Sequence, residues 1–379
     1  MSHVFIIGEA GSNWIAGTPG PTPGNFARAK DLIRAAAQAG CDAVKFQCWS
    51  GAPVYVPNAG APAYLGDGRS INDVFADNAL PLPWLPRLAA ECERAGIEFM
   101  ASVFSPADAN AVDPFVRRHK IASYELGYEA LIRHVAAKGK PVILSTGAAT
   151  LEEASAAAAW CSDADAPSLT LMHCVAAYPA PREQANLAVL RMFGMAKAIT
   201  DYGSVLMRGL LRRPRREPMP TDYGLSDHTQ HPTLCPVMAV ALGATAIEKH
   251  FTLSRALPGP DHRFAVEPDE LRQMVEAIRA AESALGDGEK VVQPCEQELR
   301  QFATRAVQAT RDIAAGERLV ANGPEANVAA LRPGNRKRGA DARFFSQMVG
   351  QLARVAIPAG DGVGMGDAVP TERGVGRVM

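Results

Sequence analysis

The chain has 379 residues with 39 Lys and Arg against 40 Asp and Glu, so its formal net charge at pH 7 is −1. This balance argues against a protein built mainly to bind nucleic acid or an anionic membrane surface. Hydrophobic residues make up 47% of the chain and charged residues 21%, which excludes a disordered or collagen-like protein. No signal peptide or membrane-spanning run is evident, so we expect a cytoplasmic protein with no membrane partner.

Eight short apolar runs alternate with stretches of helical periodicity in residues 1–286. Such runs are typical of parallel strands buried on both faces, and their alternation with helices indicates βα units. The expected strands are residues 4–7, 43–46, 97–101, 120–122, 141–144, 169–172, 223–225 and 245–247. Eight units predict an α/β fold of the (β/α)8 TIM-barrel type. A doubly wound sheet, the alternative, would show G-x-G-x-x-G after its first strand, and residues 8–12 do not match it.

Helix-end signals support the same reading. Asn25 is expected to cap a helix with apolar residues at helical spacing, and Gly40 to end it. Pro268 opens another amphipathic stretch that stops before Gly286.

The pattern changes after residue 286. Residues 287–302 are polar and contain proline, which predicts a linker; residues 303–367 have short strand signals, which predict a small β-rich domain; and residues 368–379 are expected to be a tail. Residues 312–317 and 355–361 each run an apolar strand into an Ala-Gly-acid turn. This similarity suggests an internal pseudo-repeat.

Polar residues follow the expected strands, at the end of a barrel where active sites lie. Two lysines, Lys45 and Lys120, even stand within apolar runs. A buried ammonium group is costly unless it is paired with an anion, so these lysines indicate an anionic substrate. The alternative is that each lysine pairs with a carboxylate of a neighbouring strand, such as Glu9 or Glu125.

Two histidines end neighbouring expected strands. His228 follows Asp227, and His250 lies two residues after Glu248. This arrangement predicts a metal site with two imidazole ligands and oxygen ligands completing it, although a lone histidine is more often a core residue. Nitrogen and oxygen ligands without thiolate suit manganese, iron or zinc.

Seven segments, in this order, closely resemble the sialic acid (N-acetylneuraminate) synthase family. They are residues 7–13 (IGEAGSN), 43–47 (AVKFQ), 120–123 (KIAS), 141–147 (PVILSTG), 226–229 (SDHT), 247–252 (IEKHFT) and 259–262 (GPDH). The region after residue 303 resembles the antifreeze-like (SAF) domain that ends those synthases. The resemblance therefore covers nearly the whole chain.

The resemblance implies condensation of phosphoenolpyruvate with the open-chain aldehyde of an amino sugar, which gives a 2-keto acid and phosphate with C–O cleavage. It implies that Lys45, Ser102, Lys120, Ser123 and Ser226 bind phosphoenolpyruvate. It further implies that Glu9, Glu125 and Asp261 orient the acceptor and handle protons, and that Gln47 and Tyr178 line the sugar pocket. A small trianion requires such fixed cations and hydroxyl donors.

The resemblance also implies a cofactor and a quaternary structure. His228 and His250 would bind a divalent metal, with manganese expected and magnesium, iron, cobalt or zinc as alternatives, to polarise the aldehyde. In the family the antifreeze-like domain reaches into the partner subunit's site with an arginine. Arg332 matches that position, so a domain-swapped homodimer is implied.

Departures from the family pattern concern the acceptor. Residues 175–177 lack the polar residue usual after Cys174, Tyr124 replaces a common glycine, and Ser102 replaces a threonine. Two loops, residues 17–24 and 207–220, are longer than expected and would overhang the active-site face. We therefore expect an acceptor other than N-acetylmannosamine.

The second loop carries five arginines, for which the alternatives are a cationic lid for a phosphorylated or nucleotide-bearing acceptor and a plain solvated loop. They are Arg208, Arg212, Arg213, Arg215 and Arg216. Two functions also remain open beside the condensation: a metal-dependent aldolase that uses pyruvate, and a non-catalytic sugar-binding protein.

Overall fold

The computed structural model describes residues 3–49, 54–61, 68–195, 197 and 221–370. The chain separates into two compact units, Met1–Asp287 and Gly288–Met379. Each unit is described by itself.

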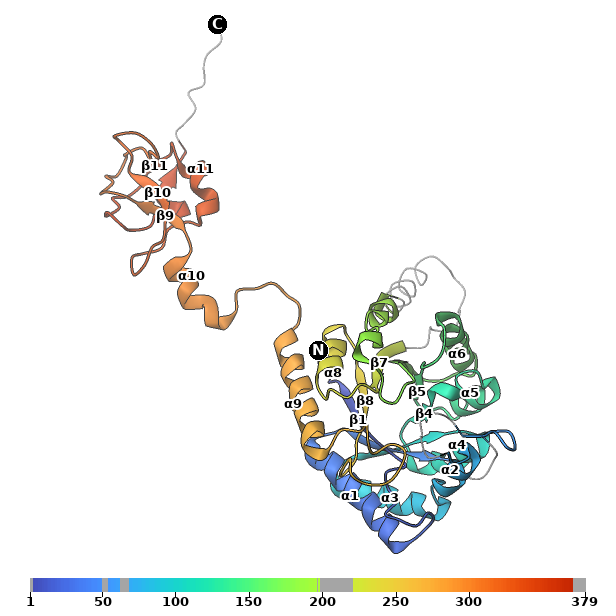
Figure 1. The fold of residues 1–379 in the computed structure, drawn as a ribbon. Helices are drawn as coiled ribbons and strands as arrows, with labels where there is room; N and C mark the ends of the chain where they lie inside the picture. The colour runs from blue at the N-terminus through green and yellow to red at the C-terminus, as the bar shows by residue number, and fades with distance from the viewer. Residues whose placement is uncertain (1–2, 50–53, 62–67, 196, 198–220, 371–379) are drawn as a thin grey trace. The chain divides into compact units, whose positions relative to one another are not determined.

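The first unit is a closed barrel whose eight parallel strands follow one another around the ring in chain order (Figure 1). Strand β1 pairs with both β2 and β8, which closes the ring. The strands are β1 (Phe5–Gly11), β2 (Ala43–Cys48), β3 (Glu98–Val103), β4 (His119–Ile121), β5 (Val142–Ser145), β6 (Leu169–Cys174), β7 (Thr221–Asp227) and β8 (Ala246–His250). The predicted (β/α)8 barrel is confirmed.

Strand β7 has the weakest sequence signal because Gly224 interrupts its apolar run. A Cβ atom at Gly224 would lie 2.3 Å from the backbone carbonyl oxygen of Ala246 in β8. Only glycine fits this close approach of two strands. The residue that obscures the strand in the sequence is therefore required by its packing.

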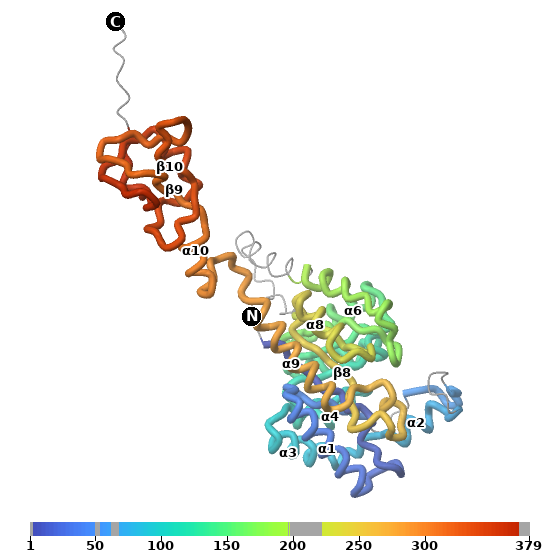
Figure 2. Tube along the Cα trace, turned by 60° about the vertical axis from the view of Figure 1, so that its left-hand side comes forward, coloured from blue at the N-terminus to red at the C-terminus, as the bar shows by residue number. Residues whose placement is uncertain are grey.

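Helices surround the barrel, and α9 packs against both α1 and α8 (Figures 1 and 2). The helices of this unit are α1 (Pro23–Ala39), α2 (Ile71–Asp77), α3 (Leu85–Ala95), α4 (Pro106–Val112), α5 (Glu129–Ala136), α6 (Leu151–Asp163), α8 (Leu234–Ala241) and α9 (Pro268–Leu285). Since α1 follows the first strand and α9 the last, their contact completes the outer layer where the barrel closes.

The ends of α1 and α9 test the helix-end signals. Thr22, not Asn25, caps α1, because the Thr22 side chain accepts a hydrogen bond from the backbone N–H of Asn25. Asn25 is buried and donates instead to the carbonyl oxygens of the preceding loop. The expected stop at Gly40 is confirmed by its left-handed φ of 86°. Pro268 is the first residue of α9, as predicted.

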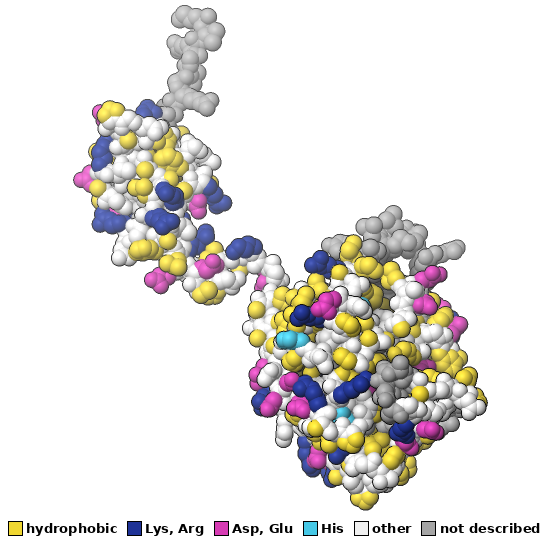
Figure 3. Space-filling model, in the orientation of Figure 1, with side chains coloured by type: hydrophobic (Ala, Val, Ile, Leu, Met, Phe, Trp, Pro, Cys, Tyr) yellow, Lys and Arg dark blue, Asp and Glu magenta, His cyan; other side chains and the backbone are white. Residues whose placement is uncertain are grey.

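Acidic and basic side chains are interspersed over the face of each unit that Figure 3 shows. This mixture agrees with the nearly neutral net charge of the chain. Within the described residues, none of the helices has the length and apolar character needed to cross a membrane.

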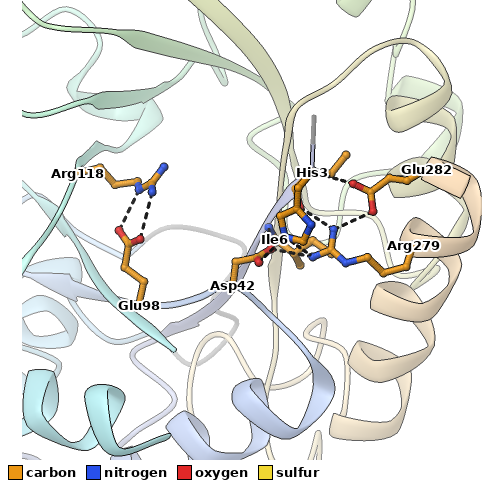
Figure 4. Close-up of polar contacts among 8 residues, drawn as sticks. His3, Ile6, Asp42, Glu98, Arg118, Arg279 and Glu282 are labelled. Carbon is orange, nitrogen blue, oxygen red and sulfur yellow. Dashed lines mark hydrogen bonds and ion pairs between the residues drawn. The ribbon is translucent and has the colours of Figure 1, made fainter. Parts of the chain in front are cut away.

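A polar network joins the starts of β1 and β2 to α9 at the N-terminal end of the barrel (Figure 4). Asp42 accepts hydrogen bonds from the backbone N–H of Ile6 at 2.8 Å and from the Arg279 guanidinium at 2.9 Å. Nearby, Arg118 and Glu98 form a two-pronged ion pair at 2.9 and 3.2 Å. At this end of the barrel, charged groups therefore satisfy one another.

The interior of the barrel is layered. A buried apolar cluster fills its middle with Ile7, Ala43, Met100, Ile143, Met172 and Ala246. Two residues further along five of these strands the inward positions are polar: Glu9, Lys45, Ser102, Ser145 and Glu248. Because inward positions recur at every second residue of a strand, the apolar layer supports a polar floor nearer the C-terminal strand ends.

The second unit is small and rich in short strands, as predicted. Strand β9 (Ala306–Ala309) pairs antiparallel with β10 (Val328–Leu331), and β11 (Leu352–Ala353) pairs antiparallel with β12 (Ala368–Val369). Its helices are α10 (Gln297–Ala303) and α11 (Phe345–Met348). Most of α10 lies in the predicted linker. The predicted start of the tail at residue 368 is too early, because Ala368 and Val369 form β12 and pair with β11.

The two similar segments of the second unit pair with each other. Ile313 and Ile357 exchange two backbone hydrogen bonds, at 2.9 and 2.8 Å, and both side chains are buried. Gly316 and Gly360 follow with left-handed φ angles of 85° and 84°. The equivalent placement of these residues supports the predicted pseudo-repeat.

Candidate active site

A cavity of about 570 Å³ lies at the C-terminal ends of the barrel strands. It brings together twelve residues predicted from the sequence: Glu9, Lys45, Gln47, Ser102, Lys120, Ser123, Glu125, Tyr178, Ser226, His228, His250 and Asp261. The thirteenth, Arg332, is an exposed residue of the second unit that directly follows β10. The twelve predicted residues of the first unit thus line one cavity.

Two buried ammonium groups dominate the floor of the cavity. Lys45 Nζ lies 2.5 Å from Glu9 Oε2 and donates a hydrogen bond to Ser102 Oγ at 2.8 Å. Lys120 Nζ donates to Ser145 Oγ at 2.7 Å. Lys45 therefore has a carboxylate partner, Glu9, from the neighbouring strand. This pairing is the predicted alternative to a lysine that is paired with an anionic substrate.

Glu248 lies between the two lysines, and not at the metal site where the sequence predicts it as an oxygen ligand. Its carboxylate is 3.7 Å from Lys45 Nζ and 3.6 Å from Lys120 Nζ, and it accepts a hydrogen bond from Ser226 Oγ at 3.0 Å. The sequence contained a signal for it: two residues before His250, Glu248 shares the inward face of β8. Ser145, which also lines the cavity, was not among the predicted site residues.

The two floor carboxylates differ in proton affinity. Burial opposes the charge of Glu248, but Lys120 and Lys45 outweigh it and hold its pKa below the ordinary value. Burial raises the pKa of Glu9 to about 6, although Lys45 opposes the shift. Glu248 therefore stays charged at neutral pH, whereas Glu9 takes up a proton in mildly acidic solution. The inner ring of two lysines and two glutamates has no net charge when both carboxylates are ionised.

Two further carboxyl groups lie above the floor. Burial raises the pKa of Glu125 to about 7, where it can give or take a proton near neutral pH. Burial also raises the pKa of Asp261, with Ser12 Oγ 3.4 Å from its carboxylate opposing the shift. The roles in proton handling that the resemblance implies for Glu125 and Asp261 stay a prediction.

The two histidines face each other across the ends of β7 and β8, with ring centroids 5.2 Å apart. Val175 O lies 2.8 Å from His228 Nδ1, and His250 Nδ1 is buried without a hydrogen-bond partner among the described atoms. Burial, followed by the nearby His228, lowers the pKa of His250 well below its ordinary value, so this ring is neutral. His228 differs, because burial is outweighed by the neighbouring Cys174 and the Val175 carbonyl, which raise its pKa. The two rings together offer nitrogen ligands to a divalent cation.

The oxygen ligands predicted from Asp227 and Glu248 do not complete that site. Asp227 points away from the cavity and pairs with Lys249 Nζ at 2.6 Å, because neighbouring residues of a strand face opposite sides. Glu248 is engaged by the two floor lysines. Among the described residues no group of three or more His, Cys, Asp or Glu is placed to hold a metal. Two histidines would leave the other coordination positions to substrate and water.

Aromatic residues line the β2 and β3 side of the cavity. The Trp49 and Phe75 rings lie 4.6 Å apart, Trp49 and Phe104 5.3 Å, and Tyr55 and Phe75 5.0 Å. The Trp49 indole N–H donates to the backbone carbonyl of Phe75 at 2.7 Å, which fixes this wall.

Three tyrosines add to the lining: Tyr124, Tyr128 and Tyr178. Tyr124, the residue that replaces a common glycine, keeps 62% of its surface exposed, and Tyr178 stacks on His228 at 4.3 Å. The polar floor and the aromatic wall therefore offer different surfaces to a substrate.

Both long loops were predicted to overhang the active-site face, and the structure tests this prediction for one of them. None of residues 17–24 lines the cavity, so the expectation that this loop overhangs the site is not supported. The loop at 207–220, with its five arginines, lies outside the described residues.

The chain is similar to known proteins over most of its length. The model of the NeuB family matches residues 32–203 and 214–290. The spore coat polysaccharide biosynthesis protein SpsE of Bacillus subtilis is 35% identical over 376 residues, which cover 95% of this chain and 92% of that protein. Its crystal structure has a TM-score of 0.59 at 34% identity and covers 98% of this chain and 96% of that chain. The pseudaminic acid synthase of Campylobacter jejuni is 32% identical over 375 residues, 96% of each chain.

Proposed function

This chain belongs to the NeuB family, and from that membership we propose that it condenses phosphoenolpyruvate with an aldehyde sugar in a metal-assisted, aldol-type reaction. The products are a 2-keto-3-deoxy acid of the sialic-acid-like, nonulosonic class and inorganic phosphate. The observation that carries the proposal is the floor of the cavity, where Lys45 and Lys120 are held by hydroxyl groups and Glu248 at the strand ends.

Phosphoenolpyruvate would bind to this floor through its phosphate and carboxylate. The two ammonium groups, with the hydroxyls of Ser102, Ser123 and Ser226, provide the cations and donors that a small trianion requires. Because the floor has no net charge with both glutamates ionised, binding a trianion favours protonation of Glu9, whose pKa is already raised to about 6.

The acceptor would lie above the floor, beside His228 and His250. A divalent cation bound by these histidines supplies Lewis-acid polarisation of the aldehyde carbonyl. Gln47, which donates a hydrogen bond to Glu9 Oε1 at 3.1 Å, and Tyr178 would border the sugar.

The condensation requires proton transfers that the carboxyl groups can perform. A bond forms between C3 of phosphoenolpyruvate and the aldehyde carbon, whose oxygen gains a proton. Water adds to C2 and loses one proton, which balances the proton gained by the aldehyde oxygen. The C2–O bond to phosphate then breaks, and the C2 hydroxyl becomes the ketone as its proton leaves with the phosphate. We assign these transfers jointly to Glu9, Glu125 and Asp261, because all three have raised pKa values and line the cavity.

We propose further that the acceptor is not N-acetylmannosamine and presents an apolar face or substituent. The support is the aromatic wall around Trp49 and Phe75, together with the side chain of Tyr124 where the family commonly has glycine. Apolar groups of a ligand gain free energy by covering such rings, whereas hydroxyl groups placed there lose hydrogen bonds to water. The name of the Campylobacter jejuni relative, pseudaminic acid synthase, also points to a product other than N-acetylneuraminate.

The test is release of inorganic phosphate from phosphoenolpyruvate by metal-stripped enzyme resupplied with Mn²⁺, across a panel of aldoses that includes N-acetylmannosamine. We expect release that requires both the metal and one sugar other than N-acetylmannosamine. Best turnover with N-acetylmannosamine would refute the altered acceptor alone. Condensation from pyruvate with no phosphate release would identify an aldolase, and sugar binding without turnover a binding protein.

We also propose a domain-swapped homodimer in which Arg332 of one subunit serves the cavity of the other, as the resemblance implies. A mixture of two inactive variants, Arg332→Ala and Lys120→Met, would then regain part of the activity, because one site of each mixed dimer carries neither change. Mixtures that stay inactive although mixed dimers form would contradict the exchange.

A further inference from the structure

Asp227 and Lys249 form a buried ion pair outside the cavity. They stand opposite each other in the register of β7 and β8, and each side chain is 2% exposed. Since side chains alternate along a strand, this pair faces away from the cavity while Glu248 and His250 face into it. The pair is thus the immediate neighbour, in the chain, of both histidines.

The hydrogen-bonding groups of this pair are saturated. The Lys249 ammonium donates to Asp227 Oδ2 at 2.6 Å, to His231 O at 3.2 Å and to Thr229 O. Asp227 in turn accepts from the Thr229 backbone N–H at 2.9 Å and from the Thr229 hydroxyl at 3.1 Å. All three ammonium hydrogens therefore have acceptors, and both carboxylate oxygens of Asp227 accept hydrogen bonds.

These bonds hold the backbone on both sides of one histidine and next to the other. His228 lies between Asp227 and Thr229, which are both bonded to Lys249, and His250 directly follows Lys249. The relative placement of the two strand ends determines how far apart the two rings lie, 5.2 Å between centroids. The pair therefore fixes backbone that carries both imidazoles, while neither of its side chains lines the cavity.

Stability alone does not explain a buried ion pair at this place. Well-packed apolar side chains of similar volume are often as stabilising as such a pair, but they lack its directional bonds. We propose that Asp227 and Lys249 are positioning residues that set the spacing of the His228 and His250 imidazoles for a divalent cation. The inference rests on the proposed role of the two histidines as metal ligands.

The test measures metal binding directly, on the full-length protein. In the variant Asp227→Asn/Lys249→Gln the charges are removed together, so that no unpaired charge is buried. We expect Mn²⁺ to bind about 10- to 100-fold more weakly, as found when partners of metal ligands are changed. We also expect the visible absorption spectrum of the Co²⁺-loaded variant to change, because this spectrum reports the geometry of the ligands.

The matched control is Glu98→Gln/Arg118→Met, which removes a cross-strand ion pair at the other end of the barrel. It should lower stability but leave Mn²⁺ affinity and the Co²⁺ spectrum unchanged. If the Asn/Gln variant does not fold, Thr229→Val keeps both charges, removes one bond to Asp227, and should weaken Mn²⁺ binding in the same direction by less.

The inference is overturned if the folded Asp227→Asn/Lys249→Gln variant keeps the Mn²⁺ affinity and the Co²⁺ spectrum of the wild type. If only Thr229→Val folds, the same result in that variant overturns it. Either result would leave the proposed function intact. If the variant His228→Ala binds Mn²⁺ as tightly as the wild-type protein, the histidines are not metal ligands. That result would refute the positioning role as well.

Discussion

The charged residues at the N-terminal end of the barrel and those on the cavity floor differ in how closely each is paired with a partner. At the N-terminal end, Arg118 and Glu98 make two hydrogen bonds at 2.9 and 3.2 Å. At the C-terminal end, Glu248 is shared between Lys45 and Lys120 at 3.7 and 3.6 Å, beyond hydrogen-bond range. The first end has few groups left to bind a ligand, whereas the second holds charges in a cavity.

This difference separates residues that stabilise the barrel from residues that act on a substrate. Charges that saturate one another lower the free energy of the folded state. Lysines that share one carboxylate at a distance, and that face a cavity, can still form ion pairs with a bound anion. Substitutions at the two ends should therefore affect different measurements, and four predictions test this separation.

The largest effect is expected from Lys120→Met. Removing one of two floor cations should lower kcat/KM for phosphoenolpyruvate about 10³-fold, since fixed charges at a reacting anion contribute effects of that size. Phosphate release measures it. The matched control is Lys140→Met at the N-terminal end, where Lys140 pairs with Asp113 at 3.0 Å, and it should keep near wild-type activity. Equal losses in both variants would remove the distinction between the two ends.

Glu125→Gln should lower kcat about 10²-fold, as expected for loss of a group that transfers protons. Burial raises the pKa of Glu125 to about 7, so the carboxyl is neutral below that pH and charged above it. The wild-type pH–rate profile should bend near pH 7 and that of the variant should not. A bend that persists in Glu125→Gln belongs to another group.

Arg118→Met tests the N-terminal end. It leaves the largely buried Glu98 carboxylate without its partner, which should lower the free energy of unfolding by about 1 to 3 kcal/mol. Chemical denaturation measures this change, and kcat/KM should stay at the wild-type value. Lost activity in a folded Arg118→Met protein would show that the two ends are coupled.

The smallest effect concerns His119, which is buried at the start of β4 with Nε2 2.9 Å from Asp113 Oδ1. Burial lowers its pKa, although Asp113 opposes the shift. The unfolded chain therefore binds a proton more readily than the folded one, and the stability that neutral His119 provides is present above about pH 6.5 and is lost below it.

Thermal unfolding of wild-type protein and His119→Gln at pH 7.5 and 5.5 checks this prediction. The advantage of the wild type should shrink at the lower pH. A difference in melting temperature that is independent of pH would mean that His119 contributes by packing alone.

Much of the fold could be predicted because it depends on local patterns. Apolar runs of three to five residues, such as residues 141–144, which form most of β5 (Val142–Ser145), are visible without knowledge of their neighbours. The capping residue of α1 was misplaced because Thr22 and Asn25 are both good caps, and only the packing of Asn25 against its loop decides between them.

The sequence predicted which residues line the site, but not which of them contact one another. Most of these residues follow a strand, and a closed barrel brings the ends of all its strands together. Which carboxylate serves which lysine depends on the stagger of the strands, which aligns Glu9 with Lys45 and with His250. Glu125, weighed as a lysine partner, lies above the floor, and Glu248 takes that place.

The barrel, the small β-rich unit and the residue types at the strand ends follow from the chain alone, because hydrophobic period and turn chemistry are local properties. Three features appear only when the chain is packed: Glu248 bridges two lysines, Asp227 turns away to Lys249, and aromatic rings form one wall of the cavity. These features require side chains from distant segments to lie at the same level along the barrel axis. The tilt and stagger of the strands determine that level.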